Sequence, residues 1–168
     1  EGVQTRYDDP DEILEQIVHT PKDQVTTLLQ NVYSAPIRDH LVGERIEEVK
    51  KSGAKCAVSV TPANTKRLAP VAEEAGADMI VVQSTVTTAR HISKSTRGLV
   101  FSELMEMVDV PVLAAGGFHD GRGLAAALAW GADGVAMGTR FLLTAESPVP
   151  DATVDRYFAA GVADVVVT

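Results

Sequence analysis

The sequence predicts an α/β fold of the TIM-type (β/α)-barrel class, in the form of a partial barrel with a helical N-terminal segment. Short apolar runs rich in valine alternate with amphipathic stretches, as they do in βα units around a parallel sheet. A glycine-containing signature recurs where an amphipathic stretch gives way to the next apolar run. About four strands can be identified in this way.

The first part of the chain has the periodicity of helices rather than strands. Apolar side chains recur at helical spacing between residues 9 and 51. Pro21 and Pro36 interrupt this pattern, and proline is a strong helix breaker. We therefore expect two or three helices here, within a mainly helical segment over residues 1–52.

The later part of the chain consists of βα units. Its apolar runs show no polar alternation, which is typical of strands buried on both faces of a parallel sheet. We interpret residues 53–168 as these units, and residues 1–168 as one barrel domain or part of one. Strands are expected at 56–60, 79–83, 111–115 and 134–138, and helices at 64–75, 102–108 and 122–130.

The recurring signature places a glycine at the end of a helix. It occurs around Gly53, Gly76, Gly131 and Gly161, each followed closely by alanine or valine and, in three cases, by aspartate. Glycine adopts a left-handed conformation at low cost, and helices commonly end on such a residue. The signature therefore marks the turn from a helix into the next strand.

Four strands make only half of a closed barrel. A complete TIM barrel has eight strands and about 250 residues, whereas this chain has 168 residues. Four strands leave two open sheet edges, which proteins seldom expose. Either the other half lies outside this chain, or two chains pair as a homo-oligomer, or the sheet is open. The chain lacks an initiator Met and ends on an apolar segment, so we expect it to be part of something longer.

The composition narrows the classes of partner. The formal net charge of −8 favours neither nucleic acid nor an anionic membrane surface. No apolar run approaches the length of a membrane helix. Cys56 is the single cysteine and no metal-ligand spacing is present. The sequence therefore predicts a cytoplasmic protein without a metal site and without a nucleic-acid or membrane partner.

Two glycine turns predict a phosphate site. Ala115, Gly116 and Gly117 end one expected strand, and Gly138 and Thr139 end the next. Glycine lets backbone N–H groups approach an anion closely, and the helix that follows the first turn directs its positive end to the same place. Barrels commonly hold phosphate between loops of consecutive strands. The alternative is that these glycines only permit tight turns.

Polar residues near the end of the 79–83 strand are further candidates. Gln83 ends that strand and Ser84 follows it, so an amide and a hydroxyl are expected at the same rim. The alternative for Gln83 is ordinary capping of the next turn. His91 and His119 each follow a strand at a short distance and could abstract a proton, although a solvent-exposed loop histidine would look the same.

The glycine turns carry a family resemblance. Residues 111–168, with AAGGFHDGRGLAAAL and GADGVAMGTRFLL, resemble the nitronate monooxygenase (2-nitropropane dioxygenase) family. The resemblance implies that Gly116, Gly117, Gly138 and Thr139 hold the phosphate of FMN. It also implies His91 as the catalytic base, since that family places a histidine after a strand ending in glutamine, here with a spacing one residue longer.

The remainder of the chain resembles a second family. Residues 1–110, with YDDPDEILEQI and PANTKRLAPVAEEAGADMIVVQSTVTTARHIS, are similar to an IMP dehydrogenase/GMP reductase-related protein. The chain thus looks like a hybrid joined near Val112. The catalytic cysteine loop of IMP dehydrogenases has no counterpart here, and Cys56, at a strand start, is interpreted as a small buried hydrophobe.

Three functions follow from these resemblances. The leading one is an FMN-dependent oxidoreductase of nitronate monooxygenase type that acts on a small carbanion-forming substrate or an enoyl thioester. The second is a nucleotide-binding relative of IMP dehydrogenase that lacks the catalytic cysteine. The third is a barrel fragment that binds phosphate and has no catalytic activity.

Overall fold

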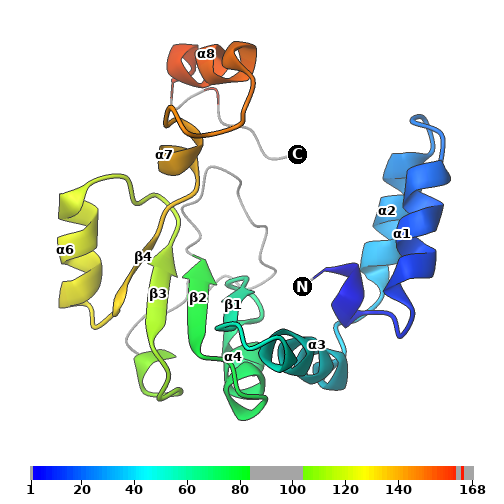
Figure 1. Ribbon diagram of the computed structural model, residues 1–168, viewed down its shortest axis with the longest axis horizontal. Helices are drawn as coiled ribbons and strands as arrows, with labels where there is room; N and C mark the ends of the chain where they lie inside the picture. Colours follow the sequence, from blue (N-terminus) through cyan, green and yellow to red (C-terminus); the bar gives the residue numbers. More distant parts are fainter. Residues whose placement is uncertain (1, 84–103, 162–163, 165–168) are drawn as a thin grey trace.

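The N-terminal segment is helical, as predicted. The computed structural model describes residues 2–83, 104–161 and 164. Its first elements are a 3-10 helix and three α-helices: η1 Val3–Thr5, α1 Pro10–His19, α2 Val25–Ser34 and α3 Asp39–Lys51. The helices α1 and α2 lie side by side, away from the sheet (Figure 1).

The sheet contains the four predicted strands. They are β1 Ala57–Val60, β2 Met79–Gln83, β3 Val112–Ala115 and β4 Gly134–Ala136. All neighbouring pairs are parallel, in the order β1-β2-β3-β4. Parallel strands in sequence order are the arrangement of consecutive βα units in a barrel wall.

Helices connect and cover these strands. The predicted helices are observed as α4 Thr65–Glu74 and α6 Gly121–Ala129, while α7 Thr139–Leu142 and α8 Asp151–Ala159 follow β4. The third predicted helix, at 102–108, is helical at Leu104 and Met105. Within the ranges that the structure describes, none of the helices has the length and apolarity needed to cross a membrane.

The two faces of the sheet differ in burial. Val60, Ile80 and Val82 are at most 1% exposed, and they belong to the same core as Leu68 and Ala72 of α4. Because side chains alternate between faces along a strand, their sequence neighbours point to the other side. These neighbours are half-buried or exposed, and they include Ala57, Ser59, Met79, Val81, Leu113 and Ala115.

The glycine signature has the predicted conformation at three of its four positions. Gly53, Gly76 and Gly131 have φ values of 80°, 90° and 97°, in the left-handed region. Gly161 does not have a left-handed φ, so the prediction was wrong there. The reason is that Ala160, the residue between the helix and the glycine, is extended, whereas its counterparts at the other three positions are still helical in conformation. The extended Ala160 already leads the chain out of the helix.

Carboxylates join neighbouring βα units at the amino ends of the strands. Asp78, which precedes β2, accepts a 2.8 Å hydrogen bond from the Cys56 N–H beside β1. Asp133, which precedes β4, accepts one of the same length from the Val112 N–H of β3. Glu73 of α4 accepts hydrogen bonds from the backbone N–H groups of Asp109 and Val110, just before β3. These contacts fix the register at the strand starts.

Candidate functional site

The carboxyl ends of three strands meet at one edge of the sheet. Gln83 of β2 is paired in register with Ala115 of β3, and Ala115 is paired with Ala136 of β4. The chain then turns at Gly116 and Gly117 after β3, and at Gly138 two residues after the end of β4. In Figure 1 these strand ends point toward the side on which α7 lies. The structure therefore brings Gln83 and both glycine turns to the same rim.

The first glycine turn needs glycine for its backbone. Gly116 and Gly117 have φ values of 101° and 76°, a region that residues with a Cβ adopt only under strain. Two successive left-handed residues bend the chain sharply as it leaves β3. The turn also presents backbone without side chains at the rim.

The second glycine turn does not need glycine for its backbone conformation, but it leaves space beside the chain. Gly138 has φ −96°, which any residue tolerates. A Cβ built on Gly138 would meet no atom of the described residues within 4 Å. Thr139 begins α7 directly afterwards, and the Gly138 carbonyl accepts from the N–H groups of Phe141 and Leu142. Space for a ligand therefore exists above Gly138.

The start of α6 is capped by a side chain that the sequence reasoning missed. The Asp120 carboxylate accepts from the backbone N–H groups of Arg122, at 3.0 Å, and Gly123, at 3.2 Å. These donors were expected to face the phosphate, and the cap occupies them. An aspartate directly before a helix is a recognisable N-cap signal, so the sequence contained this information.

Asp120 is also paired with the side chain that follows it. The guanidinium of Arg122 donates to Asp120 at 2.6 and 2.9 Å and, with the backbone N–H groups, keeps the pKa of this carboxyl below its usual value. The carboxylate is therefore held in its ionised form at the helix start, with its charge compensated by Arg122. The grip on a phosphate then depends on the two glycine turns rather than on α6.

The two histidine candidates differ in whether the structure describes them. His119 is 72% exposed, with Nδ1 3.3 Å from the Gly117 carbonyl oxygen and Nε2 3.8 Å from Asp120 Oδ2. It thus lies on the first glycine turn itself. His91 and Ser84 lie outside the residues that the structure describes.

Gln83 offers an acceptor to a ligand at the rim. Its Nε2 donates to the Ser59 hydroxyl of β1 over 3.1 Å. Its Oε1 is buried and finds no hydrogen-bond donor in the described part of the chain. A buried carbonyl without a donor costs free energy, and such groups in native proteins call for an explanation. The residues present therefore fit a ligand that combines an anionic group with a hydrogen-bond donor. Ser59 was missed because its polarity alone does not distinguish it from other surface serines.

Cys56 is placed where the sequence reasoning expected. It is 5% exposed and lies just before β1, at the end of the sheet opposite the rim. Burial, followed by the negative charge of Asp78, raises the pKa of its thiol. A thiol in this environment is a poor nucleophile. In the described ranges, no group of three or more His, Cys, Asp or Glu side chains is placed to hold a metal ion.

The chain matches the model of one protein family and is similar to curated oxidoreductases. A model of the nitronate monooxygenase family matches residues 23–168. A curated relative from Mycobacterium tuberculosis, a 5-hydroxy-7a-methyl-1-oxo-octahydro-1H-indene-4-carboxyl-CoA dehydrogenase, is 44% identical over 126 residues, which are 73% of this chain and 34% of the relative.

Two solved structures support the same fold. An IMP dehydrogenase/GMP reductase-like protein from Corynebacterium glutamicum aligns with a TM-score of 0.64 and 33% identity, over 82% of this chain and 37% of its own. FabK from Thermotoga maritima aligns with a TM-score of 0.63 and 32% identity, over 90% of this chain and 48% of its own. The chain thus spans about a quarter to a half of the length of the relatives and solved structures that it matches, in agreement with a partial barrel.

These similarities overlap along the chain. The family match runs through the expected join near Val112, and the alignment to the IMP dehydrogenase/GMP reductase-like structure also covers 82% of the chain. Both resemblances therefore apply to most of the sequence, and neither is confined to one part. Since the family model matches far more than half of the residues, the chain belongs to the nitronate monooxygenase family.

Proposed function

We propose that this chain forms the phosphate-binding wall of an FMN-dependent oxidoreductase. The observation that supports this most directly is the strand register, which aligns Gln83, Ala115 and Ala136 and so brings two glycine turns to one rim. The phosphate of FMN would lie against Gly116 and Gly117 on one side and Gly138 and Thr139 on the other. The Gln83 carbonyl would accept a hydrogen bond from another part of the same ligand.

Each residue then has a defined task. The first turn supplies backbone N–H groups without side-chain obstruction, and Gly138 supplies open space for the anion. Ser59 fixes the Gln83 amide through Nε2, so Oε1 stays directed at the ligand. FMN, when bound, supplies the electron-accepting chemistry, and the protein supplies position and orientation.

The substrate class is a small molecule that forms a carbanion, or a thioester. The relative from Mycobacterium tuberculosis is named as a dehydrogenase of a carboxyl-CoA compound, and it is 44% identical to this chain where the two align. A thioester acidifies the proton on its α-carbon, as a nitro group does. A base near neutral pKa could therefore serve either substrate.

We propose His91 as that base, on the strength of the family resemblance. Its imidazole would take the acidic α-proton while FMN is bound. His91→Asn should slow exchange of the α-proton with solvent deuterium by about 100-fold, the lower end of what general-base catalysis contributes, and should leave the flavin spectrum unchanged. His119→Asn is the matched control. If His119→Asn slows exchange and His91→Asn does not, the assignment of the base is wrong.

The phosphate site is tested by adding one methyl group at the rim. Gly138→Ala should weaken FMN binding about tenfold, a change of about 1.4 kcal/mol, because the Cβ enters the space required by the phosphate. The fold should be unaffected, since this Cβ meets no atom of the residues that the structure describes within 4 Å. Fluorescence titration of FMN measures the affinity.

A matched control separates binding from stability. Gly43→Ala places the same methyl group on α3, 3.8 Å from the Ala75 Cβ and away from the rim, so FMN affinity should stay at the wild-type value. Equal affinities of wild type and Gly138→Ala would remove the proposed phosphate site. A colourless protein that retains a purine nucleotide would favour the IMP dehydrogenase-related function, and a protein that binds neither ligand would favour the fragment without activity.

A further inference from the structure

The side chain that follows the first glycine turn attaches this turn to α6. Phe118 comes directly after Gly116 and Gly117 and is half-buried. It packs against a small apolar cluster whose buried members come from β3, from α6 and from the turn before β4: Ala114, Ala127 and Ala132. The ring of Phe118 therefore joins the glycine turn to the packing between the sheet and this helix.

Gly123 leaves the space that the Phe118 ring needs. A Cβ built on Gly123 would lie 3.0 Å from the Phe118 Cδ1, and 3.8 Å from both the Cα and the Cβ of Phe118. Carbon atoms pack best at about 3.5–4.0 Å, so a methyl group here would displace the ring or the turn. Gly123 does not have a left-handed φ. Its missing side chain therefore serves the neighbouring ring and not its own backbone.

The helix residue beneath the ring is itself held in place. The Asp120 carboxylate accepts a hydrogen bond from the Gly123 N–H over 3.2 Å, and another from the Arg122 N–H over 3.0 Å. The N-cap thus fixes the first turn of α6, and the Phe118 ring lies against that first turn. Together these contacts define where the segment before α6 lies relative to the helix.

A turn made of two glycines benefits from such support. Glycine loses more conformational freedom on ordering than any other residue, and a ligand that has to order its own site binds less tightly. We propose that Phe118 is a positioning residue, which holds Gly116 and Gly117 in the phosphate-binding conformation by packing over Gly123. This inference rests on the proposed function for the identity of its ligand.

A methyl group at Gly123, introduced in the full chain, tests the contact. Gly123→Ala should displace the Phe118 ring and weaken FMN binding about tenfold, because the turn is no longer preset for the ligand. Adding Phe118→Leu to this variant shortens the side chain, leaves space for the methyl group and should restore part of the affinity. Fluorescence titration of FMN measures both variants. A double variant that binds no better than Gly123→Ala would overturn the proposal.

Gly121→Ala is the matched control. It places the same methyl group at the start of α6, where a Cβ meets no atom of the described residues within 4 Å. Its FMN affinity should equal that of wild type. If Gly123→Ala also binds as tightly as wild type and only unfolds more easily, the contact stabilises the fold alone and the positioning role is wrong.

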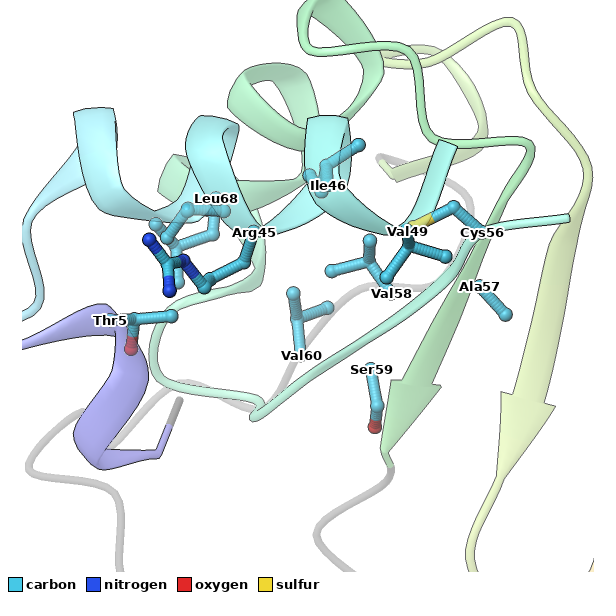
Figure 2. Close-up of a pocket in the computed structure, with 11 residues that line it drawn as sticks. Thr5, Arg45, Ile46, Val49, Cys56, Ala57, Val58, Ser59, Val60 and Leu68 are labelled. Atoms are coloured by element: carbon cyan, nitrogen blue, oxygen red, sulfur yellow. The ribbon is translucent and has the colours of Figure 1, made fainter. Parts of the chain in front are cut away.

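A second control separates affinity from general stability. A cavity of about 340 Å³ lies between α3 and β1, at the β1 edge of the described sheet, and Leu68 of α4 lines it (Figure 2). None of its lining residues belongs to either glycine turn. Leu68→Val enlarges this cavity and should destabilise the fold, while the folded protein keeps the wild-type FMN affinity. An equal loss of affinity in Leu68→Val and Gly123→Ala would contradict the proposal.

The mobility of the ligand-free turn gives a measurement that does not depend on FMN. The NMR order parameter of the Gly117 N–H should be about 0.85 in wild type, the value of a rigid backbone, and should fall below about 0.6 in Phe118→Ala. Gly123→Ala should lower it in the same direction, and the amides of β3 provide the internal reference. A protein that does not bind FMN would remove the proposed function alone. An order parameter at Gly117 that neither variant changes would overturn the role of Phe118.

Discussion

At the scale of single residues, the site combines satisfied and unsatisfied polar groups. The Gln83 amide nitrogen has a protein partner in Ser59, while its carbonyl oxygen is buried without a donor in the described part of the chain. An unsatisfied buried acceptor costs about 1–3 kcal/mol, and an ordinary hydrogen bond contributes about 1 kcal/mol. The two effects at Gln83 therefore nearly cancel in the ligand-free protein.

This cancellation gives a test of the role of Gln83. Gln83→Met should leave the free energy of unfolding within about 1 kcal/mol of wild type, because one hydrogen bond and one unsatisfied carbonyl are removed together. FMN binding should weaken about tenfold. Denaturant unfolding and flavin titration measure the two quantities.

Ser59→Ala is the control for this test. It removes the hydrogen bond but keeps the buried Gln83 carbonyl, so it should destabilise the protein by about 1 kcal/mol more than Gln83→Met does. A loss of several kcal/mol in Gln83→Met would show that the side chain stabilises the fold and that its carbonyl is satisfied. Unchanged FMN affinity would remove Gln83 from the site.

Sequence reasoning located the residues whose chemistry is local. A glycine pair at the end of a strand predicts a tight turn, and the left-handed φ values of Gly116 and Gly117 confirm that turn, while their role in holding a phosphate stays a prediction. The Asp120 cap was overlooked although it is local as well. The partner of Gln83 could not be predicted, because Ser59 is 24 residues away and meets it only through the strand register.

At the scale of elements, glycines in the left-handed conformation lie in the turns that lead from a helix into the next strand. Gly76 has φ 90°, and a Cβ there would meet nothing within 4 Å. Any cost of substitution is thus conformational. Gly43 lies inside α3, where a Cβ would make only an ordinary contact. A substitution at Gly76 therefore tests backbone conformation, and one at Gly43 tests the effect of a Cβ inside a helix.

Opposite effects are expected from the same substitution at these positions. Gly76→Ala should lower the free energy of unfolding by about 1 kcal/mol, because alanine is strained in the left-handed region. Gly43→Ala should raise it by up to about 1 kcal/mol, because alanine favours the helix. Chemical denaturation measures both. A stabilised Gly76→Ala would show that the turn can adopt another conformation at no cost.

Elements were predictable to within one or two residues for the same local reasons. The valine-rich runs and the breaks at Pro21 and Pro36 placed the four strands, the N-terminal helices, α4 and α6, whereas α7 and α8 were not predicted and the helix expected at 102–108 ends earlier than predicted. The left-handed conformation predicted at Gly161 is absent because the preceding residue, Ala160, is extended, and the sequence of the signature does not determine that conformation. At that position the Gly161 N–H instead donates to the Asp164 carboxylate over 2.7 Å.

At the scale of the whole molecule, periodicity identified a barrel wall but could not say how the barrel closes. Strand order follows from the chain order of βα units. Closure depends on contacts with strands that have no signal in the local pattern. The cavity at the β1 edge appears only when α3 and β1 are placed together. This is why the sequence left three arrangements open.

The carboxylates at the strand starts determine which parts of the protein can tolerate substitutions during evolution. Asp78 and Asp133 hold neighbouring strands at the end of the sheet far from the rim. The register is therefore anchored independently of the loops that follow the strands. Those loops can accumulate substitutions that alter ligand preference while the sheet keeps its alignment. New specificity in this wall can evolve one loop at a time.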